Sequence, residues 1–366
     1  MNWSKILLTI FALTLLNGCA DRIELEELSL IMTIGLDEVK KGQLSVETKI
    51  LDFNKQEEAA EVLIPTTGRS IRGNRSKLSS MSSGILGAGK LQIVVVSNRL
   101  LKIEDVYPYL DVLYRDAKIS NEALVISCDC KISDLMKMKL PQNPLVTEFM
   151  RKLIDTGYTE NYTVRTTLQK FHFFHYEKGI TPSISQIIPR QDTITLKGTT
   201  LLDKDGKYAA SLNLKESFLL RLLQNKLRPP GNYSTAIPHK KESLPISMDI
   251  KRADAKVSVS YRQGTYRYRV KVAIRGEVTE VIGTMEANKN LDWLQNQLNQ
   301  KLKTEMTDVI GKAQQQQTDP FGFGLYARAH LYQQWLKDKN NWGEAFSRAE
   351  VTVDPDVVIK RVGVVK

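Results

Sequence analysis

Residues 266–275, YRYRVKVAIR, alternate between large apolar side chains and mostly basic ones along their whole length. Successive side chains of a β-strand point to opposite faces, so this period of two predicts a strand with one buried face and one basic face. The basic side chains that would share the outer face are Arg267, Arg269, Lys271 and Arg275, here called the cationic row. Such a row is usual on a solvated strand, and it also fits an acidic partner or lipid headgroups.

The residues that flank this stretch predict an α+β domain over 246–366. Residues 256–261 indicate a partner strand across a turn that contains Gly264. Residues 290–310 predict a long amphipathic helix, because apolar side chains recur there at steps of three and four. These side chains are Leu291, Leu294, Leu298, Leu302, Met306 and Val309. The remaining elements expected are a helix at 325–337 and strands at 350–353 and 357–365.

Upstream, strands and helices alternate, which predicts a second α+β domain over 19–190. The expected strands are 28–36, 44–53, 91–96 and 122–130, and the expected helices are 103–113 and 144–155. Residues 68–89 are rich in Ser and Gly, but Ile71, Leu78, Met81 and Ile85 recur at helical spacing and favour a helix there.

Residues 191–245 are expected to form a small middle domain or connector. A hairpin of 193–202 and 208–212 turns at Asp205-Gly206, and a short helix follows at 215–223. The chain as a whole is therefore expected to be α+β, with mixed sheets and packed helices in more than one domain.

The N-terminus has the pattern of an export signal. An apolar run of 11 residues, 6–16, follows Lys5 and is too short for a spanning helix, which needs about 20 residues. The run ends in Leu16-Asn17-Gly18-Cys19, which resembles a bacterial lipobox. That likeness implies a signal peptide at 1–18, cleavage after Gly18 and a diacylglyceryl group on Cys19. An ordinary secretory signal and a buried N-terminal helix are the alternatives.

Composition fits a globular protein near an anionic surface. The formal net charge is +11, and removal of Lys5 with the signal leaves +10. For a membrane-held chain, lipid headgroups are a nearer partner than nucleic acid, although a merely solvated basic surface explains the charge equally well. The remaining cysteines, Cys128 and Cys130, are expected to be buried free thiols.

The sequence lacks the common motifs of catalytic and cofactor-binding sites. It has no phosphate-binding loop, nucleophile elbow or cluster with metal-ligand spacing. The H-x-x-H of His172 and His175 lies in an aromatic run that favours a core-packed helix. We therefore expect no metal, no cofactor and a binding or assembly role rather than catalysis. A lipid-tethered cell-wall hydrolase with scattered carboxylates stays open as an alternative.

Four stretches, in this order, resemble the Ger(x)C family, the C-subunit lipoproteins of spore germination receptors. They are Cys19 to Leu28; GKLQIVVVS at 89–97 with LDVLYRD at 110–116; GTTLL at 198–202 with Glu216, Leu219 and Leu220; and DPFGFGLY at 319–326 with Trp335, Trp342 and the closing V-x-V and I-K-R-x-G pattern. Ala20 and Lys90 depart from the Trp and His that the family often has there.

The resemblance implies a non-enzymatic, lipid-anchored subunit with a multi-domain α+β fold specific to the family. It implies a place on the outer surface of the spore inner membrane. Two integral membrane subunits, A and B, would be the partners in nutrient-triggered germination. The alternative from another class is a solute-binding lipoprotein of an ABC importer, which would require two doubly wound lobes.

Overall fold

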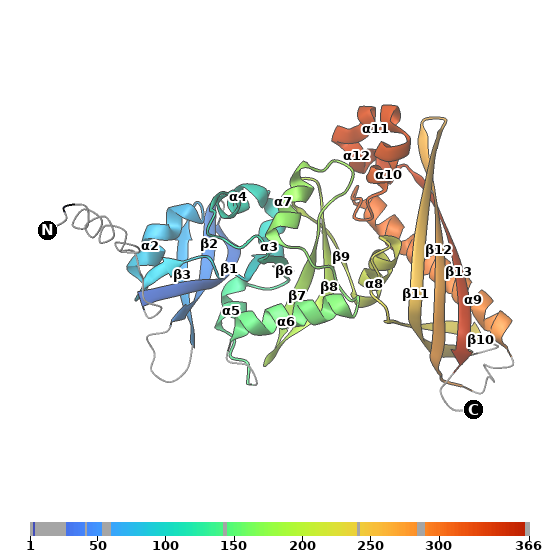
Figure 1. Cartoon of the computed structure of the whole chain (residues 1–366), viewed down its shortest axis with the longest axis horizontal. Helices are drawn as coiled ribbons and strands as arrows, with labels where there is room; N and C mark the ends of the chain where they lie inside the picture. The colour runs from blue at the N-terminus through green and yellow to red at the C-terminus, as the bar shows by residue number, and fades with distance from the viewer. Residues whose placement is uncertain are drawn as a thin grey trace.

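The computed structural model describes residues 3, 27–40, 42–52, 60–141, 145–239, 242–283 and 290–362. Within these residues, two sheets lie toward opposite ends of the long axis, and helices pack on both (Figure 1). The expected fold class, α+β with mixed sheets and packed helices, is confirmed.

The large sheet contains nine of the described strands, in the order β3-β2-β1-β5-β6-β7-β8-β9, with β4 paired to β1. Their bounds are β1 Leu28–Lys40, β2 Gln43–Asp52, β3 Ala60–Gly68, β4 Ile85–Gly87, β5 Ile93–Ser97, β6 Leu124–Cys128, β7 Ser183–Arg190, β8 Thr193–Leu202 and β9 Tyr208–Leu212. The central strands β1, β5, β6 and β7 are parallel, and the outer pairs are antiparallel. Every residue of β5 and β6 is buried, as expected for parallel strands covered on both faces.

Helices cover both faces of this sheet. One face carries η2 Arg72–Asn74, α2 Arg75–Ser80, α3 Asn98–Ile103, α4 Tyr107–Arg115 and α7 Leu168–Tyr176. The other carries α5 Ile132–Lys137 and α6 Val146–Thr159. Alternate residues of β5 serve the two cores: Val94 and Val96 belong to the first, and Ile93 and Val95 to the second.

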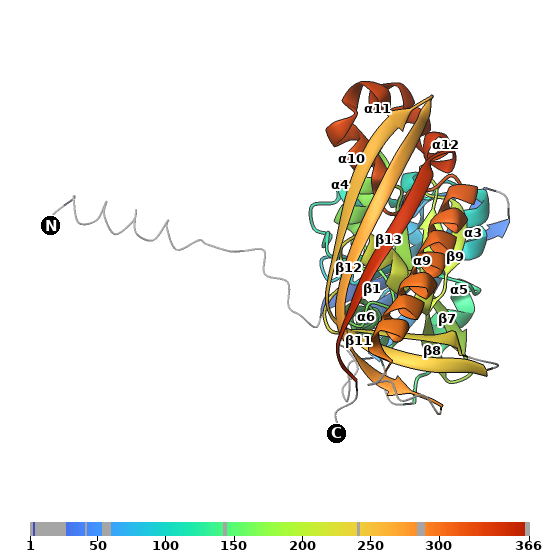
Figure 2. The same cartoon turned by 90° about the vertical axis from the view of Figure 1, so that its right-hand side faces the viewer.

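The small sheet has the order β10-β11-β12-β13 and packs on one long helix. Its strands are β10 Gly231–His239, β11 Glu242–Arg262, β12 Thr265–Val281 and β13 Glu350–Val362. Figure 2 shows α9 Leu291–Gln315 running along β13. The remaining helices are α8 Leu214–Leu223, α10 Phe323–His330, α11 Tyr332–Asp338, η4 Lys339–Asn341 and α12 Trp342–Ser347.

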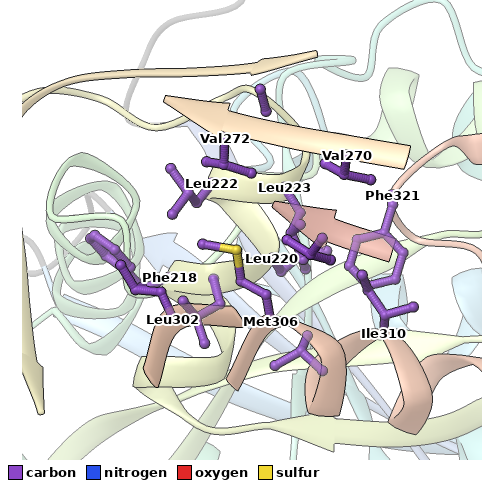
Figure 3. Close-up of a cluster of buried hydrophobic side chains, with 14 of the residues drawn as sticks. Phe218, Leu220, Leu222, Leu223, Val270, Val272, Leu302, Met306, Ile310 and Phe321 are labelled. Atoms are coloured by element: carbon purple, nitrogen blue, oxygen red, sulfur yellow. The ribbon is translucent and has the colours of Figure 1, made fainter. Parts of the chain in front are cut away.

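Helix α8 joins the two sheets in one hydrophobic core. Figure 3 shows Leu220, Leu222 and Leu223 of α8 beside side chains of β12 and α9. The same core reaches Leu201 and Leu212 of the large sheet. The segment 191–245, expected as a middle domain or connector, thus gives β8 and β9 to the large sheet and β10 to the small one.

Several local predictions are confirmed and others are wrong: the helix expected at 325–337 is α10 and α11, and the strands expected at 350–353 and 357–365 are the single strand β13. The hairpin of β8 and β9, the helix α9 and the alternation of β12 are as expected. The single helix expected over 68–89 is instead η2, α2 and β4. The helix expected over 103–113 is α4, which begins later, at Tyr107, with Pro108 in its first turn, where the missing N–H costs little. Ile103 instead ends the separate helix α3, which Ser97 caps by accepting from the Leu100 backbone N–H.

Candidate functional site

The cationic row lies on the face of β12 that points away from α9, and acidic side chains of β13 neutralise much of it. The ion pairs are Arg267–Glu350 at 3.0 Å, Arg269–Asp354 at 2.6 Å and Arg275–Asp356 at 3.2 Å. Lys271 is exposed and lies opposite Asp354 in the parallel register of β12 and β13. The outer face is therefore a ladder of mixed charge, and a partner surface here stays a prediction.

The sequence did not predict that carboxylates of β13 pair with the row, because they are more than 80 positions away from it. Only the parallel pairing of β12 with β13 brings them together. Exposed ion pairs of this kind are worth about 0–1 kcal/mol each, so they leave the arginines free to exchange partners at little cost.

The proposed lipid-attachment residue Cys19 and the cleavage position after Gly18 lie outside the described residues. The first described strand, β1, begins at Leu28. None of the helices in the described ranges combines the length and apolar character that a membrane crossing requires.

A buried carboxylate organises the junction between the two sheets. Asp319 is fully buried and accepts hydrogen bonds from the backbone N–H groups of Gly322 at 2.9 Å and Gly324 at 2.8 Å, and from the indole N–H of Trp342 at 2.8 Å. Burial raises the pKa of Asp319 to about 6, and these hydrogen bonds oppose part of the rise. The DPFGFG stretch is thus a turn held together by hydrogen bonds to one buried acidic side chain.

The same segment binds the large-sheet half of the molecule. The carbonyl of Asp319 accepts from the Thr181 backbone N–H at 2.9 Å, and the carbonyl of Pro320 accepts from the Gln224 side chain at 2.7 Å. Gly179 and Gly324 approach so closely that a Cβ on Gly324 would lie 2.6 Å from the Gly179 Cα. These contacts join the loop before β7, the end of α8 and the start of α10.

A polar cleft of about 390 Å³ opens beside this junction. Its walls come from the α7–β7 loop, the β8–β9 turn, the end of α9 and residues 339–344, so both halves of the molecule contribute. Lys178, Lys204 and Lys339 line it together with Asp203 and Asp205. This mixed charge suits a polar contact surface.

A second, apolar cavity of about 70 Å³ lies between the large sheet and α2. Ile31, Ile34 and Val46 form part of its wall, and Arg72 and Arg75 also line it. Asn74, 2% exposed, lines the same cavity, and both polar atoms of its side-chain amide lack a hydrogen-bond partner.

The expectation of two free thiols is wrong, because Cys128 and Cys130 form a disulfide. Cys128 ends β6 and is buried, and the intervening Asp129 pairs with Lys197 of β8 at 2.6 Å. The spacing of two residues gave no sign of pairing, since sequence distance alone does not fix which cysteines meet.

The H-x-x-H run forms the helix α7, as expected. The His175 ring packs 4.1 Å from the Tyr107 ring, and the His172 ring 4.3 Å from that of Tyr114. Among the described residues, no group of three or more His, Cys, Asp or Glu side chains could hold a metal ion.

Comparison with known proteins gives a match along nearly the whole chain. Residues 21–189 match the model of the spore germination protein N-terminal domain, and residues 197–363 match the spore germination B3/GerAC-like C-terminal model. The boundary between the two models falls at the turn from β7 to β8.

Individual relatives agree in length as well. The chain is 20% identical to spore germination protein GerQC of Bacillus cereus, over 98% of each protein. It is 23% identical to spore germination protein KC of Bacillus subtilis (strain 168), over 97% of this chain and 95% of that protein. The crystal structure of the GerBC protein has the same fold, with a TM-score of 0.60, 18% identity, and coverage of 92% of this chain and 100% of that one.

Proposed function

The chain belongs to the Ger(x)C family of spore germination proteins, and we propose that it is the lipid-anchored C subunit of a germinant receptor. The observation that carries this proposal is the pair of family models, which together cover 21–189 and 197–363 and begin two residues after Cys19. The anchor and the folded body therefore have the order expected of a tethered subunit.

The anchor in this proposal is a diacylglyceryl group on Cys19, exposed by cleavage after Gly18. Each buried CH₂ contributes about 0.8 kcal/mol, so two acyl chains hold a protein that one chain would hold only marginally. The body would lie on the outer surface of the spore inner membrane. Its partners would be the integral membrane A and B subunits, and nucleic acid would not be among them.

The proposed role is assembly and signalling for nutrient-triggered germination, without catalysis. The buried Asp319 has a structural use, since three donors of the junction converge on it. Together with the shared core around α8, this junction makes the two sheets one body. Such a body suits a subunit that passes a displacement between membrane partners.

The fold also separates this proposal from the importer alternative. A solute-binding lipoprotein would need two doubly wound lobes with parallel central sheets. Here the small sheet pairs β10, β11 and β12 in antiparallel fashion and adds only β13 in parallel. This arrangement favours the receptor subunit.

The test is affinity purification of the tagged protein from detergent-solubilised spore inner membranes, read by mass spectrometry. Recovery of two multi-pass subunits supports the proposal, whereas a permease with an ATPase would favour the importer. Cys19→Ala should abolish acyl labelling and release the protein from membranes. The matched control, Cys128→Ala with Cys130→Ala, should keep the label, because Cys19 is then the one cysteine left in the sequence.

A further inference from the structure

The segment that contains η2 and α2 is basic and contains no acidic residue of its own. Residues 62–103 contain seven Lys and Arg and no Asp or Glu. Four of these cations, Arg69, Arg72, Arg75 and Lys77, are exposed. No carboxylate in the described ranges forms an ion pair with any of the four, in contrast to the cationic row of β12, where β13 supplies the acids.

Large apolar side chains are exposed directly after these cations. Met81, which follows α2, is 56% exposed, and Ile85, at the start of β4, is 54% exposed. Exposed cations beside exposed apolar side chains are typical of a surface that rests in the headgroup region of a bilayer. We call Arg69, Arg72, Arg75, Lys77, Met81 and Ile85 the N-terminal basic patch.

The geometry of β1 places this patch near the membrane anchor. Leu28, the first residue of β1, is the parallel partner of Ile85 in β4. Cys19 precedes Leu28 by nine residues, which span at most about 32 Å when fully extended. The 21 residues of β11 are about 70 Å long at 3.3 Å per residue, so the tether is much shorter than the small sheet.

We propose that the N-terminal basic patch docks on the anionic surface of the bilayer that holds the Cys19 anchor. The cations would lie over acidic headgroups, and Met81 and Ile85 would enter the interface. This inference rests on the lipid anchor of the proposed function. Because α2 lies at the end of the molecule opposite the small sheet (Figure 1), docking would point β10–β13 away from the membrane.

The test uses the lipidated full-length protein in vesicles of phosphatidylcholine, with and without 30% phosphatidylglycerol. Acylation of Cys19 and the disulfide of Cys128 and Cys130 leave an introduced cysteine as the one reactive thiol. Ser79→Cys on α2 would carry an environment-sensitive dye, and Ser258→Cys on the exposed face of β11 would carry it in the control. We expect a blue shift and quenching by lipid-borne quenchers at position 79 alone, stronger with anionic lipid and lost at high salt.

Charge variants then separate this patch from the cationic row. Arg72→Glu with Arg75→Glu and Lys77→Glu should reduce the signal at position 79 to its level in pure phosphatidylcholine. The matched triple, Arg267→Glu with Arg269→Glu and Lys271→Glu, should leave the signal unchanged. The salt titration of the unmodified chain tests the same electrostatics independently of whether a triple variant folds.

The outcomes distinguish the two proposals. A protein that fails to float with vesicles, although Cys19 is intact, contradicts the lipid anchor itself. If the protein floats but the dye at position 79 is as exposed to water as the dye at position 258, the anchor is supported and the docking is overturned. Equal signals with and without anionic lipid, or a signal gained only when membrane subunits are added, also overturn docking on lipid.

Discussion

The carboxylate of Asp319 accepts a hydrogen bond from the indole N–H of Trp342 at 2.8 Å. This bond ties the turn before α10 to the first residue of α12, while the carbonyl of Asp319 holds the backbone of Thr181 from the other half of the molecule. A single buried residue therefore connects three segments that are far apart in the sequence.

Replacing Asp319 by Ala should destabilise the protein by about 3 kcal/mol at pH 7. The change leaves the N–H groups of Gly322, Gly324 and Trp342 buried without an acceptor, and hydrogen bonds to a charged group are worth about 1.5–3 kcal/mol each. Denaturant unfolding measures the loss. Asp356→Ala, which removes only an exposed ion pair, is the control and should cost less than about 1 kcal/mol. Equal losses in the two variants would contradict the role of Asp319.

The raised pKa of Asp319 predicts a specific dependence of stability on pH. Its pKa is about 6 in the folded protein against an ordinary value of 3.8, so between these values the folded state binds more protons than the unfolded state. The pH-dependent part of the stabilisation from this group is complete below pH 3.8 and is lost as the pH rises through 6, by about 3 kcal/mol in total. The measurement is the difference in unfolding free energy between the natural protein and Asp319→Asn, followed from pH 4 to 8. A difference that stays constant over this range would refute the shift.

Gly198 should tolerate no side chain. Its φ of 136° lies where L-residues are strained, and a Cβ there would collide with the Leu212 carbonyl on β9. Gly198→Ala should cost about 3 kcal/mol or more in unfolding free energy. The matched control is Gly311→Ala in α9, where nothing lies within 4 Å and Ala should stabilise by about 0.5–1 kcal/mol. Similar effects at the two positions would show that β8 and β9 do not approach as described.

Charge reversal of Arg267, Arg269 and Lys271 should weaken recovery of the membrane subunits if the cationic row binds an acidic partner. Stability should change by less than about 1 kcal/mol per broken pair, because the pairs are exposed. The exchange Arg269→Glu with Asp354→Arg restores the ion pair between β12 and β13, but position 269 then carries a negative charge. Recovery rescued by this exchange would assign the row a structural use, whereas recovery that stays low would support a partner surface.

Local periodicity was sufficient to predict elements whose burial follows one simple stripe. The helix α9 buries Leu294, Leu298, Leu302 and Met306 completely, and β12 buries each apolar position of its alternation from Tyr266 to Ile274. These patterns depend only on the geometry of the helix or strand, which is the same in every fold.

Other features depend on contacts between distant residues. The acids of β13 reach β12 through a parallel pairing that no local pattern encodes, and Pro355 is tolerated there because β13 is an edge strand. Likewise, the DPFGFG motif was visible, but the indole that binds Asp319 follows 23 positions later. In 68–89, the helical spacing of Ile71, Leu78 and Ile85 was outweighed by the pairing of Ile85 with β1.

The sheet topology also limits how members of this family can exchange parts. The two family models meet between 189 and 197, yet β7 and β8 on either side pair along the length of β7. A chimera cut at that boundary would have to match strands from two parents within one sheet. A crossover between α8 and β10, at 224–230, would keep the large sheet from a single parent. Recombination in this family should therefore succeed more often at that later position than at the boundary between the models.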